Sequence, residues 1–316
     1  MNFSQIEYYI AICEENSISQ AAKKLFITQS ALSQQLLRLE NELGTQLFLR
    51  QGNNLIMTES GKEFLDSART ILFEYRNVRN RITDTIGNHI LTLAVTKTKS
   101  FITLCYLLPG FRRQNPDIKV EIKEVDSYQV ESLLIHGEAD LGFCYGSNDA
   151  NLIYHDICDE PILLAVPPEH PLAMHKAGES SQYPQIQFGD IVNEPFIVGE
   201  NGYLSKYTAK LFESNHVIPN VVMKTSNPGL VHLLVAANIG MAFIGEISSW
   251  IAPRQVQQPA YFVLRETPQT CIKVALAHHR KKHVTYPMKQ FIAYAREELS
   301  KCISRGLPFD ASVNHP

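Results

Sequence analysis

The hydrophobic pattern of this chain changes its period near residue 89, and this change constrains the fold more than any other feature. Before it, apolar residues recur at spacings of three and four, which is typical of amphipathic helices. After it, short apolar runs such as residues 90–95 alternate with helical segments, which is typical of an α/β domain with a mostly parallel sheet. We therefore expect a small helical part followed by a larger α/β part.

The composition is that of an ordinary globular protein and gives no sign of nucleic-acid binding. The chain has 316 residues, 45% of them hydrophobic, which excludes a disordered or collagen-like chain. Its 29 basic and 32 acidic side chains give a net charge of −3, so it lacks the strongly basic character of many nucleic-acid-binding proteins. Residues 1–58 are themselves slightly acidic, with four basic and five acidic side chains.

Several classes of site and location are disfavoured by missing motifs. The six cysteines include no C-x-x-C pair, so neither a zinc site nor a dense disulfide framework is expected. We find no common nucleotide, zinc-protease or serine-hydrolase signature, and we expect no enzyme activity, catalytic residue, metal or cofactor. Without a secretory signal or an apolar stretch of about 18 residues, we expect a cytoplasmic protein with no membrane partner.

The first part of the chain predicts a helix-turn-helix. Helices are expected over about 4–15, 18–25 and 29–43, with Ser17 and Thr28 as N-caps of the second and third and Gly44 as the stop. In the third helix, Leu32, Leu36, Leu39 and Leu43 form one buried stripe. The opposite side is polar near the start of the helix, and such side chains can bond base edges or phosphates. We therefore expect DNA contacts from Thr28, Gln29, Ser30, Ser33, Gln34 and Arg38. The alternative is an ordinary solvated helix face.

A hairpin directly after these helices predicts a wing. Two strand-like runs, 47–50 and 54–57, flank a turn at 51–53, which places Arg50, Asn53 and Asn54 near the phosphate backbone.

With this wing, the N-terminal part closely resembles the LysR-type transcriptional regulators. The resembling runs, in order, are Ser17-Ile18-Ser19-Gln20-Ala21-Ala22, Thr28-Gln29-Ser30-Ala31-Leu32-Ser33-Gln34-Gln35-Leu36, Leu39-Glu40, Leu43-Gly44, Leu47-Phe48-Leu49-Arg50 and Met57-Thr58-Glu59-Ser60-Gly61. The family often carries Arg where this chain has Gln34 and Leu37, which puts the family's usual DNA contacts in doubt at those two positions.

A long helix over residues 59–87 is expected to pair two chains. Its apolar seam alternates by four and three and supplies the predicted dimerisation residues Phe64, Ala68, Ile71, Tyr75, Val78 and Ile82. The resemblance also implies a dimerising linker helix here. The alternative is a helix that faces the core of its own domain.

From residue 90 onward the pattern predicts two α/β lobes that the chain crosses twice, near 161–168 and 262–268, with a ligand cleft between them. This part resembles the family's periplasmic-binding-protein-like effector-binding domain in its runs 107–109, 137–141, 167–172 and 235–242. The expected domains are a winged helix-turn-helix at 1–58, the linker helix at 59–89, the effector-binding domain at 90–305 and a tail at 306–316. Lobe I covers about 90–163 and 268–305, and lobe II about 164–267.

Loops that follow the strands of both lobes supply the candidate effector contacts. Helix N-termini at such loops favour anions, and two lysines lie in the first loop, so we expect a small anionic effector. The candidates are Thr96, Thr98, Ser100, Ser127, Gly199, Asn201, Tyr203, Ser205 and Thr225. For any single residue, an ordinary N-cap or turn role is an equal alternative.

The resulting expectation is a bacterial regulator that binds a double-stranded DNA operator, responds to a small-molecule effector and recruits RNA polymerase. The resemblance implies a homodimer that assembles to a tetramer. Three rivals remain: a solute-binding protein, an enzyme with an appended DNA-binding domain, and a redox sensor of the same family that uses Cys105 and Cys144. We expect those two thiols to be buried structural groups instead. The run His278–His283 is expected to be a solvated loop.

Overall fold

The computed structural model describes residues 1–51, 54–87, 89–96, 106–145, 148–174, 183–200, 203–225, 227–249, 257–265 and 271–305. The chain forms two compact units, one made of Met1–Gly87 with His136–Glu138 and the other of Asn88–Ile135 with Ala139–Pro316. The helix expected to be a separate linker thus groups with the N-terminal helices.

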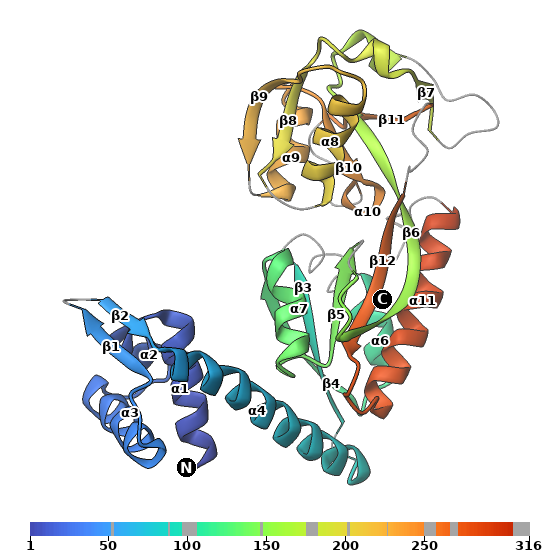
Figure 1. Ribbon diagram of the computed structural model, residues 1–316. Coiled ribbons are helices and arrows are strands. Elements are labelled where there is room, and N and C mark those ends of the chain that lie inside the picture. The colour runs from blue at the N-terminus through green and yellow to red at the C-terminus, as the bar shows by residue number, and fades with distance from the viewer. Residues whose placement is uncertain are drawn as a thin grey trace. The chain divides into compact units, whose positions relative to one another are not determined.

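The first unit is built from four helices and a hairpin (Figure 1). Its elements are α1 (Phe3–Glu15), α2 (Ile18–Lys24), α3 (Gln29–Leu43), β1 (Phe48–Gln51), β2 (Asn54–Met57) and α4 (Glu59–Thr85). The expected caps Ser17 and Thr28 are present, and Thr58 caps α4 in the same way, because each of these side chains accepts a hydrogen bond from the backbone N–H three residues later. β1 and β2 pair antiparallel, as expected for a wing.

The second unit alternates strands and helices. Its elements are β3 (Ile90–Thr96), α6 (Leu108–Gln114), β4 (Lys119–Val125), α7 (Ser127–Ile135), β5 (Leu141–Tyr145), β6 (Leu152–Val166), β7 (Gln185–Ile186), β8 (Pro195–Gly199), α8 (Tyr203–Ser214), β9 (Asn220–Thr225), α9 (Pro228–Ala236), β10 (Ala242–Gly245), α10 (Glu246–Ser249), β11 (Ala260–Leu264), β12 (Cys271–His279) and α11 (Tyr286–Arg305), with short 3₁₀ turns at Pro171–Met174 and Phe188–Asp190.

The strands form two lobes that share β6. Lobe I contains β3, β4, β5, β12 and the first part of β6, and lobe II contains β7 to β11 and the last part of β6. The main sheet has the order β4-β3-β5-β12-β6-β11-β7, with β10 also paired to β6. The strands β3, β4 and β5 are parallel, but β12 runs antiparallel to both of its neighbours, so the sheet is more mixed than we expected.

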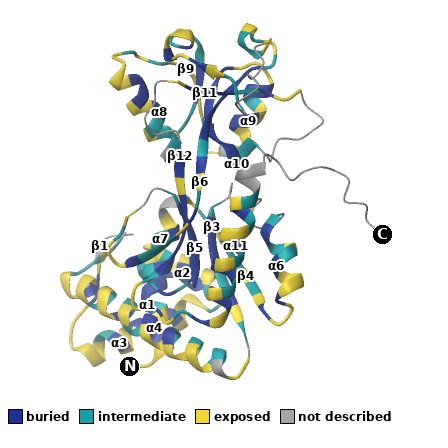
Figure 2. Cartoon of the chain, turned by 90° about the vertical axis from the view of Figure 1, so that its right-hand side faces the viewer, coloured by how far each residue is buried: buried dark blue, intermediate teal, exposed yellow. Residues whose placement is uncertain are grey.

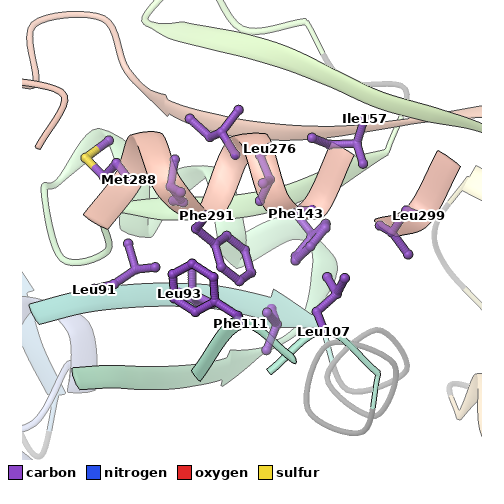
Figure 3. Close-up of a cluster of buried hydrophobic side chains, with 14 of the residues drawn as sticks. Leu91, Leu93, Leu107, Phe111, Phe143, Ile157, Leu276, Met288, Phe291 and Leu299 are labelled. Carbon is purple, nitrogen blue, oxygen red and sulfur yellow. The ribbon is translucent and has the colours of Figure 1, made fainter. Parts of the chain in front are cut away.

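Each lobe has its own apolar core. In lobe I, α6 and α11 pack on the sheet, and Phe111 and Phe291 meet edge to face with ring centroids 5.1 Å apart (Figure 3). In lobe II, Phe196 packs against both Phe212 and Phe243. These cores are the dark blue strands and helix faces of Figure 2.

The structure differs from two expectations for the second unit. The crossing expected near 161–168 is part of a longer strand, β6, that begins at Leu152, because residues 152–161 pair along the whole of β12. The run at 278–283 is not wholly solvated: His278 lies in β12, one residue before its end, and is buried, and the Lys282 ammonium is buried against the Asp140 carboxylate at 2.7 Å.

Candidate nucleic-acid interface and ligand site

The third helix lies over α1 and α2 with its leucine stripe inward. Leu32, Leu36 and Leu39 are buried in a cluster with Ala21 and Ala22 of α2, as expected. Leu43 is 41% exposed, so the stripe is one residue shorter than we expected. The reason is that α3 ends at Leu43, where Gly44 adopts φ +69° and turns the chain away toward the hairpin.

The opposite side of α3 carries several of the predicted DNA contacts. Gln29, Ser30, Gln34 and Arg38 are exposed and Ser33 is half-buried. Ser30, Gln34 and Arg38 lie on the side of α3 opposite the leucines, whereas Gln29 is exposed because it is the first residue of the helix. The Thr28 hydroxyl accepts from the Ala31 N–H at 3.2 Å and lies 3.2 Å from the Ser30 hydroxyl, so Thr28 acts locally as a cap. The structure describes neither Asn53 nor the side chains of Arg50 and Asn54.

Positive charge on this unit is partly neutralised within the chain. The Lys24 ammonium lies 2.9 Å from carboxylate oxygens of both Glu14 and Glu15, and these hydrogen bonds raise the pKa of Lys24. The N-terminal ammonium pairs with Glu42 at the end of α3. Of the basic side chains in residues 1–58, Lys24 is thus paired with acidic groups of the chain, whereas Lys23 and Arg38 are exposed.

The predicted seam of α4 divides into two halves. Ala68 is fully buried against Ile6 and Ile10 of α1, and Phe64 and Ile71 pack beside it. Ala68 therefore offers no surface to a second chain, and the alternative of a core-facing helix holds for this half. Beyond it the seam is exposed, at 43% for Tyr75, 42% for Val78 and 57% for Ile82.

The strands of each lobe direct their carboxyl ends toward the other lobe. Because β5 and β6 both run antiparallel to β12, and β3 and β4 run parallel to β5, these ends lie at the edge from which β6 leaves lobe I. In lobe II, β10 runs antiparallel to β6. Phe196 of β8 forms a parallel bridge with Met241, directly before β10, and β9 is parallel to β8. The carboxyl ends of β8, β9 and β10 therefore point toward lobe I. Ligands of α/β proteins bind outside such strand ends.

Most candidate effector residues lie at these ends. Thr96, Gly199 and Thr225 are the last residues of β3, β8 and β9, and Ser127 and Tyr203 are the first of α7 and α8. Ser205 lies in the first turn of α8 and is half-buried. Thr98, Ser100 and Asn201 lie outside the described residues, as do the side chains of Ser127 and Tyr203.

One candidate hydroxyl has a local partner. The Thr225 Oγ1 accepts from the Asn227 N–H at 3.1 Å, and Asn227 in turn caps α9. For Thr225 the ordinary turn role is therefore present.

Two buried carboxylates near the junction of the lobes were missed. Glu160 of β6 is fully buried and accepts a hydrogen bond from the Ile247 N–H at 3.0 Å, and the buried Glu246 accepts one from the Tyr183 hydroxyl at 2.7 Å. Gly245 approaches Glu160 so closely that an added Cβ would lie 2.6 Å from its carboxylate carbon. These residues follow no motif, so only their long-range pairing reveals them.

Two of the described thiols lack the lowered pKa that makes a thiol reactive. Burial raises the pKa of Cys13 to about 11 and that of Cys144 to about 12. Cys105 lies outside the described residues. Among the residues that the structure describes, no group of three or more potential metal ligands comes together, and no helix is long and apolar enough to cross a membrane.

Comparison with known proteins matches both parts of the chain. Residues 3–62 match the family model of a bacterial regulatory helix-turn-helix protein, lysR family, and residues 88–300 match the LysR substrate binding domain. The Escherichia coli HTH-type transcriptional regulator cbl is 30% identical over 79% of this chain and 78% of its own length. The E. coli hca operon transcriptional activator HcaR is 25% identical over 95% of this chain and 99% of its own length.

Solved structures share the fold. CbnR, a LysR family transcriptional regulator, superposes with a TM-score of 0.65 at 20% identity, over 94% of this chain and 99% of its own. Full-length CbnR in complex with its target DNA superposes with a TM-score of 0.62, also at 20% identity, over 94% of this chain and 100% of the CbnR chain.

Proposed function

This chain is a member of the LysR family of bacterial transcriptional regulators, and we propose that its α3 face reads an operator while a small anionic metabolite binds between its lobes. The family and the relatives are DNA-binding regulators with an effector-binding domain, not enzymes. We infer that such a protein works in the cytoplasm, where its operator and RNA polymerase are.

One observation carries the DNA-reading part of the proposal: the first two turns of α3 present exposed polar side chains, while the leucines of the same helix are buried. Gln side chains can bond an adenine edge in two places, and the N-terminal turn of a recognition helix enters the major groove. Gln29, Ser30 and Ser33 occupy that turn and the next one.

Footprinting of the single variants Gln29→Ala and Ser33→Ala tests this assignment. A lost bidentate contact costs about 1–3 kcal/mol, so Gln29→Ala should weaken the site about 5- to 150-fold or relax its sequence. Glu63→Ala on the exposed side of α4 is the matched control and should leave the footprint unchanged. If neither Gln29→Ala nor Ser33→Ala changes affinity or sequence preference, α3 is not the recognition helix.

The charge balance of the first unit bears on how affinity is assembled. With Lys24 and the N-terminus paired internally, few phosphate contacts release counterions, so the salt dependence per subunit should be shallow. Affinity then depends on several subunits that bind together. A plot of the logarithm of affinity against that of salt concentration should be shallower than for a strongly basic relative.

Three helix N-termini support an anionic effector. α7, α8 and α9 each follow a strand whose carboxyl end faces the opposite lobe, and N–H groups at helix N-termini favour negative charge. In α9, Asn227 already accepts one of these N–H groups. Glu160 and Glu246 both accept hydrogen bonds from this chain, so their charges are partly offset. Titration calorimetry with small carboxylates, neutral analogues and amines tests the class. Binding of only the neutral or cationic compounds would refute it.

The exposed half of α4 supports pairing of two chains. Tyr75, Val78 and Ile82 leave an apolar stripe in solvent, as a dimerising helix does before it meets its partner. We propose that two such dimers form a tetramer and that the effector changes their geometry, and with it DNA bending and RNA polymerase recruitment. Light scattering of Val78→Glu should show a smaller assembly than the unmodified chain, whereas Glu74→Gln should assemble normally.

A further inference from the structure

Phe26 is the most exposed large apolar side chain of the described residues and has a strained backbone. It lies in the turn between α2 and α3, is 95% exposed and has φ +56°. Its neighbours Leu25 and Ile27 both pack on the apolar core of the first unit. The turn itself is fixed by hydrogen bonds from the Phe26 N–H to the Lys23 carbonyl and from the Ile27 N–H to the Ala22 carbonyl.

Folding does not explain a phenylalanine at this position. The other described non-glycine residues with positive φ are Asn16, His216 and Asn238, and asparagine and histidine are the residue types enriched in this region. Phenylalanine has no polar group with which to stabilise a left-handed conformation locally, and glycine would adopt it without strain. The side chain therefore adds strain and exposed apolar surface and gains no packing within the chain.

The position in the fold indicates what covers the ring. Phe26 comes two residues before Thr28, the N-cap of α3, and Gln29 and Ser30 follow directly. If the first turn of α3 enters the major groove, the preceding turn lies at the rim of that groove, beside the sugar-phosphate backbone. The exposed Lys23 lies in the last turn of α2, and its carbonyl accepts from the Phe26 N–H. Because residues 1–58 carry only four basic side chains, contacts that do not depend on charge would add to the affinity for DNA.

We propose that Phe26 is a DNA-contact residue whose ring packs on an apolar group of the operator at the rim of the major groove. The group is a deoxyribose or the C5 methyl of a thymine, which present the same apolar chemistry. The contact adds affinity that is insensitive to salt and sets the angle at which α3 enters the groove. This inference rests on the assignment of α3 as the recognition helix.

The variant Phe26→Gly separates folding from binding. It removes the ring and the strain together, so the thermal midpoint of the full chain should rise or stay unchanged while operator affinity falls. Half-burial of a phenyl ring corresponds to about a 5-fold loss per subunit, or about 25-fold for a dimer on two half-sites. The slope of affinity against salt should not change, because no phosphate contact is lost.

Three comparisons complete the experiment. Phe26→Tyr keeps both ring and strain and should bind as the unmodified protein does. His216→Gly makes the same backbone change in lobe II and should leave affinity unchanged. An operator with deoxyuridine in place of thymidine distinguishes the two apolar groups, because only a methyl contact is lost with it.

The outcomes separate this inference from the proposed function. Normal affinity of Phe26→Gly beside a weakened Gln29→Ala would overturn the contact and leave the recognition helix in place. If operator affinity falls neither in Phe26→Gly nor in Gln29→Ala, the assignment of α3 as the recognition helix is refuted. Normal binding by Phe26→Gly with lost transcription would overturn the DNA contact in favour of a polymerase contact, and a lower thermal midpoint would contradict the strain argument.

Discussion

Replacing Lys282 with methionine should destabilise lobe I severely, because it leaves a buried carboxylate without its counterion. The side chains of Lys282 and Asp140 are 3% and 8% exposed, and their charged atoms lie 2.7 Å apart. The ammonium also donates to the Ala139 carbonyl at 3.1 Å, and the second oxygen of Asp140 accepts from the Thr92 N–H at 2.7 Å. The pair therefore joins the loop after β12 to both β3 and β5.

The size of the effect follows from this burial. Removing one partner of a buried ion pair costs about 3–5 kcal/mol, whereas replacing both partners costs less, since no charge is stranded. We expect a loss of unfolding free energy in that range for Lys282→Met and for Asp140→Asn. The loss in the double variant should be at least about 2 kcal/mol smaller than the sum of the two single losses. The neighbouring exposed Lys281 provides a control, and Lys281→Met should cost less than about 0.5 kcal/mol.

Urea unfolding followed by circular dichroism measures the free energies for the four proteins of the cycle. The reasoning is refuted if Lys282→Met costs less than about 1 kcal/mol, or if the two single effects simply add. Either result would mean that water or another group solvates Asp140 once the ammonium has gone.

Three further effects are expected. Gly245→Ala should lower the urea midpoint, because its Cβ would lie 2.6 Å from the Glu160 carboxylate carbon, and Gly189→Ala, whose Cβ meets nothing within 4 Å, should not. Since burial raises the pKa of Cys144 to about 12, iodoacetamide followed by mass spectrometry should label this thiol at pH 7.5 only after unfolding; rapid native labelling would contradict the burial. Burial also lowers the pKa values of the stacked His155 and His278, so the unfolded chain binds more protons and stability should fall as the pH drops below about 6.5. His155→Gln should flatten that pH dependence, and an unchanged slope would exclude the pair as its source.

The N-terminal elements could be predicted because their signals are local. Ser17, Thr28 and Gly44 act on backbone groups within a few residues, and the helices start and stop where these residues indicate. The exposed polar face of α3 follows from the same periodicity. The exposure of Phe26 could not be predicted, because it depends on how the turn orients a side chain that the sequence shows only as apolar.

Long-range pairing accounts for what the sequence did not show. The first half of β6 carries His155, Asp156, Asp159 and Glu160, which conceal a strand until its partner β12 is known. Likewise Lys282 is buried only because Asp140 lies opposite, 142 positions earlier in the chain. The periodicity of α4 indicated an apolar seam correctly, but period alone does not say whether the same chain covers it, as α1 does at Ala68.

The shared strand β6 also has a mechanical consequence. Its partner changes from β12 to β10 between Pro161, which faces Cys271, and Ile162, which faces Gly245. Proline has no N–H to donate to a neighbouring strand, so fewer interstrand hydrogen bonds restrain β6 here than within either lobe. If the two lobes rotate relative to each other, we therefore expect β6 to twist mainly at Pro161, beside the buried Glu160.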